Sequence, residues 1–214
     1  MKDNSQKIIL SLCGGTGAWE DPYRKAGYDV RLITLPDIDV RKYKPPAGVY
    51  GILAAPPCTM FSQARTRAST PRDLREGMIV VRACLEIVWE CRSQITYLKD
   101  GALRFWALEN PKGFLQYFLG QPRLEFDPCD FGDAYTKRTH IWGHFNIPKK
   151  SPVAIPESLK QKFSLNIRDL PKLPPQRNPL FNPNDFSMTE REPRIAQRAI
   201  TPAGFANAFF KENQ

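Results

Sequence analysis

A cysteine directly after a short apolar run is the first residue in this sequence that could do chemistry. Cys58 follows residues 49–55 and the pair Pro56 and Pro57, and proline ends a strand because it cannot donate a ladder hydrogen bond. A structural cysteine more often lies within an apolar run, as a small hydrophobe. Cys58 is therefore a candidate reactive group, although a loop cysteine without a role would explain it when taken alone.

A carboxylate occupies the equivalent position after a second apolar run. Residues 103–108 read as a strand, and the segment Glu109-Asn110-Pro111 follows it. In open α/β sheets ligands bind outside the carboxyl ends of the strands. We therefore expect Glu109 and Cys58 at the same edge of the sheet.

Glycines follow the first apolar run of the chain. Residues 7–12 have a buried-strand pattern, and a helix-compatible segment covers residues 18–26. Glycines at such a strand-to-helix turn let the backbone approach a ligand and leave amide groups facing it. Many such turns contain glycine, so the cluster is weak evidence by itself. The residues between the two elements that could bind a ligand are Cys13, Gly14, Gly15 and Gly17.

Two acids follow the second predicted strand, residues 28–35. Asp37 and Asp39 lie where a ribose or an adenine edge would lie in a nucleotide-binding α/β fold. Solvated acids in a turn are an equally good interpretation.

The elements that must position these residues alternate between strands and helices. In residues 72–98, apolar residues recur at spacings of three and four, which predicts the best-defined helix of the chain. Residues 200–212 predict a closing helix with Thr201 as its N-cap and Pro202 at its first position. A short helix is expected over residues 114–119 and a strand over residues 139–143. The pattern predicts an α/β fold with a doubly wound, mostly parallel sheet.

Composition limits the class of protein. The chain has 214 residues, with 31 Lys and Arg against 22 Asp and Glu, giving a formal charge of +9. This charge favours polyanions such as nucleic acid, although a basic, unspecialised surface is the alternative. Five cysteines form no C-x-x-C pair and only two histidines are present, so neither a zinc site nor a disulfide framework is indicated. We expect a soluble protein of the reducing cytoplasm, without a signal peptide, membrane span or metal.

The predicted organisation has three parts. Residues 1–148 form the catalytic and cofactor-binding α/β domain, residues 149–197 a proline-rich basic excursion, and residues 198–214 a C-terminal helix that packs back on the domain. A polar, basic loop should follow Cys58, and its candidate contacts to phosphates are Ser62, Arg65, Arg67 and Arg72. For any one of these arginines, a solvated loop is an equally good interpretation.

Taken together, these motifs resemble those of the cytosine carbon-5 DNA methyltransferases, over most of the chain. The segment from Ser11 to Gly17 is similar to the cofactor glycine motif of that family, and Asp39 is placed like its adenine-contacting acid. Pro57-Cys58-Thr-Met-Phe-Ser62 is similar to the nucleophile motif Pro-Cys-Gln-x-Phe-Ser, and Glu109-Asn110-Pro111 to Glu-Asn-Val. Lys137-Arg138 is similar to the Gln-x-Arg-x-Arg region, and residues 198–206 to the C-terminal motif that folds back beside the cofactor.

The resemblance implies a sheet of the class I S-adenosylmethionine-dependent methyltransferase type and a covalent mechanism. Cys58 would attack carbon 6 of cytosine, which makes carbon 5 able to accept a methyl group. Glu109 would bond ring nitrogen 3, and Arg138 would hold the carbonyl oxygen of the base or steady the Cys58 loop. In duplex DNA the nucleotide must be flipped out of the stack. The residues implied to bind S-adenosylmethionine are Cys13, Gly14, Gly15, Gly17, Asp39 and Pro57.

This sequence departs from the family pattern at several positions. Ser11 stands where an acid usually precedes the glycine motif, Thr34 where a ribose-binding acid would end the second strand, and Thr59 where Gln usually follows the cysteine. Thr136 stands at the position of the family's first arginine. Only residues 143–198 separate motifs that usually flank a target-recognition domain, so residues 149–197 would be a reduced target-recognition region. We therefore expect sequence selectivity to be weak, to be built from this proline-rich excursion, or to be supplied by a partner or a second copy of the chain. Such compact versions resemble methylases encoded by phages or prophages, which act in a bacterial host.

Several alternatives stay open. The same chemistry could act on RNA or on a free cytosine nucleotide, or use a modified S-adenosylmethionine. A degenerate, non-catalytic DNA-binding module is a further alternative, and intact Cys58 and Glu109 argue against it. A thiol redox or cysteine hydrolase domain is less well supported, because neither His140 nor His144 has a sequence context that suggests a base for Cys58.

Overall fold

The chain forms a six-stranded sheet in a computed structural model, which describes residues 3–63, 65, 69–94, 103–154 and 200–214. The strand order is β2-β1-β3-β4-β6-β5. The first four strands are parallel, and β6 runs antiparallel to both β4 and β5. The bounds are β1 Ile8–Leu12, β2 Asp29–Ile33, β3 Val49–Ala54, β4 Phe105–Pro111, β5 Leu124–Phe126 and β6 Thr139–His144.

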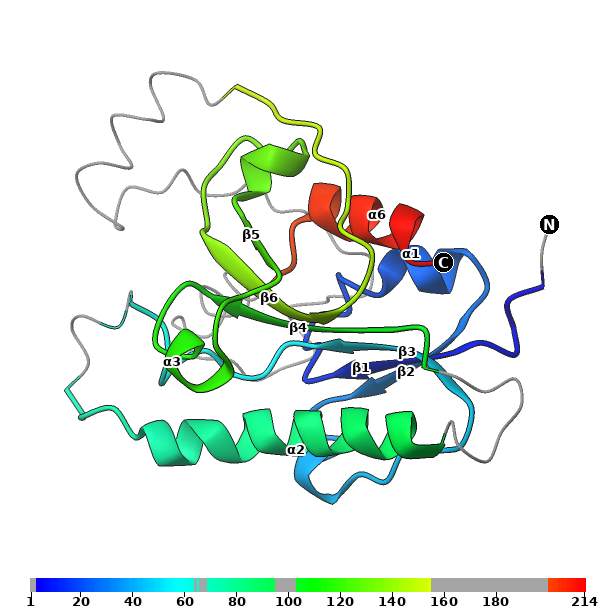
Figure 1. The fold of residues 1–214 in the computed structure, drawn as a ribbon, viewed down its shortest axis with the longest axis horizontal. Coiled ribbons are helices and arrows are strands. Elements are labelled where there is room, and N and C mark those ends of the chain that lie inside the picture. Colours follow the sequence, from blue (N-terminus) through cyan, green and yellow to red (C-terminus); the bar gives the residue numbers. More distant parts are fainter. Residues whose placement is uncertain (1–2, 64, 66–68, 95–102, 155–199) are drawn as a thin grey trace.

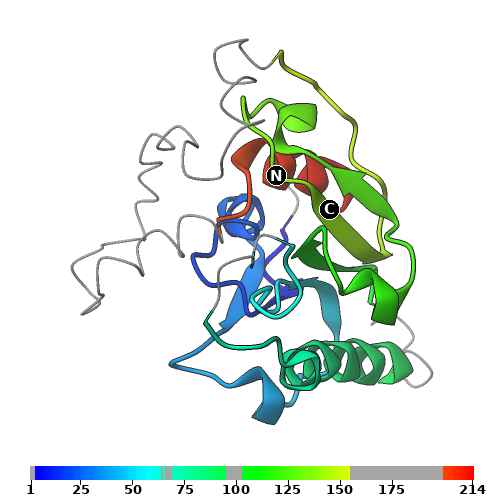
Figure 2. The same cartoon turned by 90° about the vertical axis from the view of Figure 1, so that its left-hand side faces the viewer.

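Helices cover both faces of this sheet. Figure 1 shows α2 (Leu74–Ser93) along one face, and α1 (Asp21–Lys25) with α6 (Ala203–Glu212) on the other. The view in Figure 2 shows the same layers from the side. The remaining short helices are α3 (Gln116–Leu119), η1 (Val40–Lys42) and η3 (Pro128–Phe131). The predicted α/β class with a doubly wound, mostly parallel sheet is confirmed.

The two-residue period of the strands sorts the core into two layers. Leu10 of β1 packs in the cluster under α2, whereas its neighbour Ile9 packs with α1 and α6. Apolar residues of α2 fill the first layer, among them Cys84 and Cys91, which are buried as the spacing predicts. Aromatic rings fill the second layer, where Phe205 of α6 stacks on Phe126 of β5 with ring centroids 4.2 Å apart. Every central strand is therefore covered on both faces.

The C-terminal helix α6 packs against β5 and the rest of the second core layer, and Thr201 is not its N-cap. Pro202 occupies that position, and the helix begins at Ala203. A carboxylate from outside the helix satisfies one free amide instead, because Gly204 N donates to Asp133 Oδ2 at 3.0 Å. The Thr201 prediction is wrong because sequence spacing does not reveal a capping group 71 residues away.

The loop around η3 also binds the residues just before segment 155–199, which lies outside the described residues. Ser151 N donates to Asp130 O and Val153 N to Cys129 O, both at 2.9 Å. Both flanks of residues 155–199 are thus bonded to residues 129–133. Of the predicted excursion, residues 149–154 lack helix and strand and the rest lies outside the described residues, so the three-part division stays a prediction.

Candidate active site

The predicted reactive residues follow neighbouring strands of the sheet. β1 lies between β2 and β3, and β3 lies between β1 and β4. The glycine turn follows β1, Cys58 follows β3, and Glu109 lies near the carboxyl end of β4. Because the chain order reverses between β1 and β3, this edge is the topological switch point at which α/β sheets bind ligands. The fold therefore brings the glycine turn and the two reactive side chains to one edge.

Cys58 lies on a turn that its own backbone closes. Phe61 N and Ser62 N both donate to Cys58 O, at 2.9 and 2.8 Å. The side chain of Phe61 is fully buried and anchors the turn in the core. Arg72 fastens it from outside, because its guanidinium donates to Met60 O and Ser62 O at 3.0 and 2.8 Å. These contacts fix the half-buried Cys58 thiol relative to the sheet.

Backbone and side-chain contacts join the Cys58 turn to the end of β4. The buried Asn110 Nδ2 donates to Pro56 O at 3.0 Å, and Phe114 N donates to Phe61 O at 2.9 Å. Gly113 makes this approach possible, since a Cβ there would lie 2.2 Å from Phe61 O. On the left of Figure 1 the turn after β3 accordingly lies beside α3. The position of Cys58 is thus coupled to that of Glu109.

Cys58, Glu109 and Lys137 share one electrostatic environment. Lys137 Nζ lies 3.7 Å from Glu109 Oε1, and the two side chains are only 22% and 14% exposed. Burial raises the pKa of the Cys58 thiol, the negative charge of Glu109 raises it further, and the positive charge of Lys137 opposes both. The thiol, the carboxyl group and the ammonium are therefore near enough to influence one another's charge.

Lys137 lies beside Glu109, which the sequence analysis did not expect, whereas the predicted residue Arg138 makes its contacts with other acids. The guanidinium of Arg138 donates to Asp127 Oδ2 at 2.7 Å and to Glu125 Oε1 at 2.8 Å, and half of the side chain is exposed. No described contact joins it to Cys58 or Glu109. Adjacent residues of an extended chain point to opposite sides, so only one of the two basic residues can face Glu109.

The glycine turn has the backbone that its composition indicates. Gly15 and Gly17 have φ of 55° and 74°, and Cys13 adopts 57°, which is uncommon outside glycine. At Gly14 a Cβ would lie 2.0 Å from Ser11 Oγ, so only glycine fits there, whereas one at Gly15 would meet nothing within 4 Å. The turn therefore packs closely against the end of β1 while its tip faces open space.

The other predicted cofactor residues lie at the same edge of the sheet. Asp39 is held by its neighbour, since its carboxylate accepts from Arg41 N, Nε and Nη2 at 2.7–3.0 Å. Hydrogen bonds from the Arg41 side chain, then from its backbone, lower the pKa of Asp39 to about 2. Pro57 is exposed next to Cys58. A contact of either residue with a cofactor stays a prediction.

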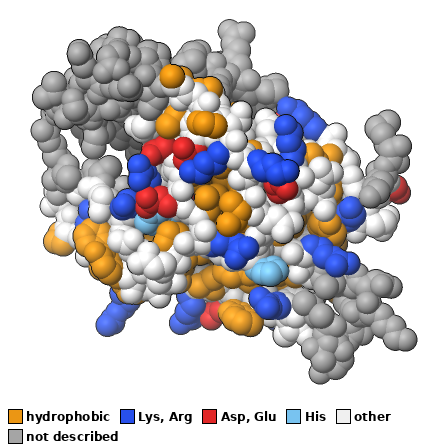
Figure 3. All heavy atoms as spheres, turned by 45° about the horizontal axis from the view of Figure 1, so that its top comes forward, with side chains coloured by type: hydrophobic (Ala, Val, Ile, Leu, Met, Phe, Trp, Pro, Cys, Tyr) orange, Lys and Arg blue, Asp and Glu red, His pale blue; other side chains and the backbone are white. Residues whose placement is uncertain are grey.

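The predicted phosphate-binding residues brace the Cys58 turn where they are described. Besides the contacts of Arg72, Arg65 bonds Met60 Sδ at 3.0 Å and Thr70 Oγ1 at 2.8 Å. Ser62 forms a bridge with Gly113, and Arg67 lies outside the described residues. In Figure 3 lysine and arginine side chains are scattered over one face, with a few acidic side chains among them. Contacts of these four residues with nucleic acid stay predictions.

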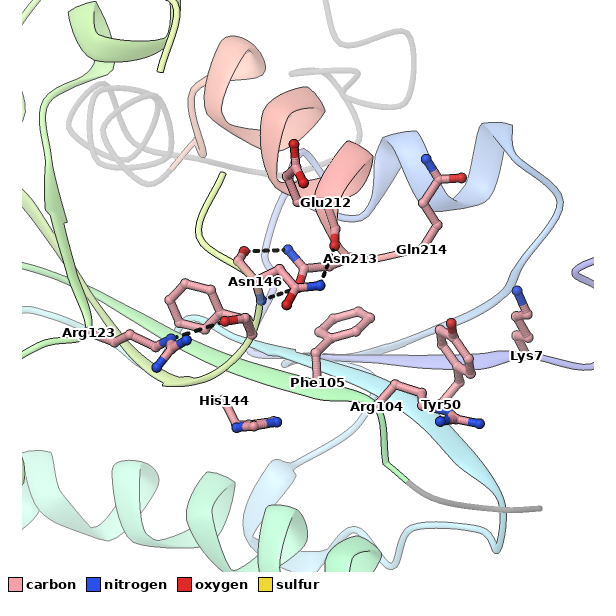
Figure 4. A pocket seen from close by; sticks show the side chains of 11 residues that line it. Lys7, Tyr50, Arg104, Phe105, Arg123, His144, Asn146, Glu212, Asn213 and Gln214 are labelled. Carbon is pink, nitrogen blue, oxygen red and sulfur yellow. Dashed lines mark hydrogen bonds between the residues drawn. The ribbon is translucent and has the colours of Figure 1, made fainter. Parts of the chain in front are cut away.

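A hollow of about 530 Å³ lies at the opposite end of the sheet, far from Cys58. Figure 4 shows its lining, which includes Lys7 before β1, Tyr50 in β3 and Arg104 before β4. These residues mark the amino ends of the parallel strands, and the hollow contains none of the predicted reactive groups. Within the described ranges, no group of three or more His, Cys, Asp or Glu could hold a metal ion, and no helix has the length and apolarity to cross a membrane.

Comparisons with known proteins give only distant similarities. No protein-family model matches the chain, and no curated protein matches it. A solved candidate DNA modification methyltransferase encoded within an E. coli prophage has a TM-score of 0.47 and 15% identity, covering 69% of this chain and 53% of that one. The Entamoeba histolytica methyltransferase EhMeth has a TM-score of 0.37 and 10% identity, covering 71% and 56%. The chain thus spans about half the length of these proteins. Both TM-scores are low, so the function is inferred from the geometry of this chain.

Proposed function

We propose that this chain is an S-adenosylmethionine-dependent methyltransferase that acts on carbon 5 of cytosine in DNA through a covalent bond to Cys58. One observation carries the proposal: a half-buried thiol and a carboxyl group from different strands share one electrostatic environment beside a glycine turn at the switch point of the sheet. If Cys58 were only a core residue and Glu109 only a solvated acid, nothing would require the two side chains to lie in one environment.

Cys58 would supply the nucleophile. The reacting species is the thiolate, whose sulfur bonds carbon 6 of the ring and pushes electrons toward carbon 5. Because burial and Glu109 raise the pKa of Cys58, the resting group is a thiol that must lose its proton before attack. The hydrogen bonds from Phe61 N and Ser62 N to Cys58 O hold the sulfur in place for this step.

Glu109 and Lys137 would stabilise the negative charge that the attacking sulfur brings to the cytosine ring. A carboxyl group bonded to nitrogen 3 can share or donate a proton there as the sulfur attacks. Lys137, 3.7 Å from Glu109, supplies a positive charge that stabilises the thiolate and the electron-rich ring. After carbon 5 has accepted the methyl group and lost its proton, the carbon–sulfur bond breaks and regenerates the Cys58 thiolate.

The turn after β1 would hold the methyl donor. Its backbone fits a ligand because the space beside Gly15 is open and a buried carboxylate, Glu20, lies beneath the turn without a hydrogen-bond partner among the described residues. S-adenosylmethionine, when bound, supplies an electrophilic methyl group. The residues that we propose hold it are Cys13, Gly14, Gly15, Gly17, Asp39 and Pro57.

DNA is the proposed substrate because of the charge balance and the residues beside Cys58. The net charge of +9 attracts a polyanion. The basic turn with Ser62, Arg65, Arg67 and Arg72 adjoins the proposed nucleophile, where the phosphates flanking a flipped nucleotide would lie. Target selectivity, the cytoplasmic setting and a phage or prophage origin belong to the same proposal.

The decisive experiment traps the covalent adduct. Duplex DNA of mixed sequence, with all cytosines replaced by 5-fluorocytosine, is incubated with the protein and S-adenosylmethionine, because fluorine blocks the final elimination. We expect a stable adduct on the Cys58 peptide by mass spectrometry, none with Cys58→Ala, and an unchanged amount with Cys129→Ala, a half-buried cysteine elsewhere. Parallel reactions with tRNA that contains 5-fluorocytosine and with 5-fluoro-dCMP test the other substrates. Adducts only with the tRNA or only with the nucleotide would remove DNA from the proposal, and none at all would refute it.

A further inference from the structure

Glu20 is a buried carboxylate that no contact in the fold explains. Its side chain is 0% exposed, and neither carboxylate oxygen has a hydrogen-bond partner among the described residues. The cation beside it, Arg24, lies at the limit of an ion pair, with Nη2 4.0 Å from Oε1. Burial raises the pKa of Glu20, and its own backbone amide, the Ser11 hydroxyl and the charge of Arg24 oppose that rise more weakly. An incompletely paired buried charge is costly to a fold, so its presence calls for a partner.

The carboxylate lies directly beneath the glycine turn. A Cβ added at Gly14 or at Gly17 would lie 3.3 Å from Glu20 Oε1 in each case. Only the glycine backbone therefore separates the buried carboxylate from the turn. A larger side chain at either position would crowd the carboxylate, so the two glycines let the turn pack directly against it.

The same place lacks a carboxylate from β1. Ser11 is buried at the second-last position of that strand, where the resemblance leads one to expect an acid. A Cβ at Gly14 would lie 2.0 Å from Ser11 Oγ and 3.3 Å from Glu20 Oε1, so both side chains border the same point of the turn. Glu20, which follows the glycine turn in the sequence, thus places a carboxylate near the end of β1.

We propose that Glu20 recognises the α-ammonium group of the amino-acid portion of the ligand in the glycine turn. The inference rests on the proposed function, because S-adenosylmethionine carries such a group. An ammonium donates to carboxylate oxygens and supplies the positive charge that Arg24 provides only at a distance. The neighbouring acid Asp21 cannot do the same, because it is turned to the surface and pairs with Lys25 at 2.6 Å.

The first test uses the unmodified protein, so it does not depend on the folding of a variant. Calorimetry compares S-adenosylhomocysteine with an analogue that lacks only the α-amino group. We expect at least about tenfold weaker binding of the analogue, as for the loss of a charge-assisted hydrogen bond. Equal affinities would refute the inference while leaving the cofactor proposal intact. Binding of neither compound would refute the cofactor proposal itself.

The second test assigns the effect to Glu20. In Glu20→Gln, affinity for S-adenosylhomocysteine should fall at least about tenfold, whereas affinity for the analogue without the amino group should stay within twofold. The matched control Asp21→Asn removes the adjacent acid and should change neither affinity. An equal loss for both ligands in Glu20→Gln would show that Glu20 only shapes the turn, and no loss for either would show that the ammonium binds elsewhere.

Discussion

Gly113 gives the sharpest test of whether the Cys58 turn and the end of β4 form one unit. In Gly113→Ala the new Cβ would start 2.2 Å from Phe61 O and 3.0 Å from Phe61 C. The two segments must then separate by roughly 1 Å, and a misplacement of that size near a reaction centre costs about 100-fold in rate. Overpacking costs about 1–3 kcal/mol, and loss of the Phe114 N to Phe61 O bond costs about 1 kcal/mol more.

Two measurements separate the local shift from the loss of stability. Thermal unfolding should show a melting temperature lowered by roughly 5–15 °C, given about 2–4 °C per kcal/mol for a chain of this size. Mass spectrometry of the Cys58 peptide should show an altered rate of alkylation by iodoacetamide, and methyl transfer should fall about 100-fold.

Gly48→Ala is the matched control. Gly48 has φ of 75° and nothing within 4 Å of a Cβ, so alanine there introduces backbone strain of roughly 1–2 kcal/mol without a clash. This variant should lose stability but keep normal Cys58 alkylation. If Gly113→Ala also left the alkylation of Cys58 and the rate of methyl transfer unchanged, the mechanical coupling of the two segments would be refuted.

Two further predictions concern charge. The negative charge of Glu109 raises the pKa of Cys58, and the positive charge of Lys137 lowers it. Glu109→Gln should therefore lower the pH midpoint of Cys58 alkylation, and Lys137→Met should raise it. Shifts of both variants in the same direction would contradict the shared environment. Hydrogen bonds, first from His140, lower the pKa of Glu125 from 4.5 to about 2. A depressed pKa contributes stability above pH 4.5 that is lost as the pH falls toward 2. Urea unfolding should therefore show a shallower acid-side decline in Glu125→Gln than in the wild type, and parallel pH curves would overturn this assignment.

The sequence predicted the positions of the reactive side chains well because strand order and apolar runs determine them. Residues 49–55 are apolar without interruption, as a strand covered on both faces must be, and Pro56 ends the run. Cys58 therefore had to lie at the carboxyl edge. The same reasoning applies to Glu109, although it lies within β4 and not beyond it.

Other features depend on contacts that a linear pattern does not contain. The preference for Arg138 over Lys137 was a choice between adjacent residues. The partners that distinguish the two, Asp127 and Glu109, come from other parts of the chain. The reversed direction of β6 likewise follows from its pairing with β4 and β5, since an apolar run reads the same in either direction.

The shared attachment of both flanks of residues 155–199 has an evolutionary consequence. Because Ser151, Val153 and Gly204 all bond to the loop 129–133, the exit and re-entry points of that segment are fixed next to one another. For a flexible connection between fixed ends, each doubling in length costs only about 0.6 kcal/mol of closure free energy. The described part of the fold therefore keeps both attachment points whatever length of chain evolution places between them.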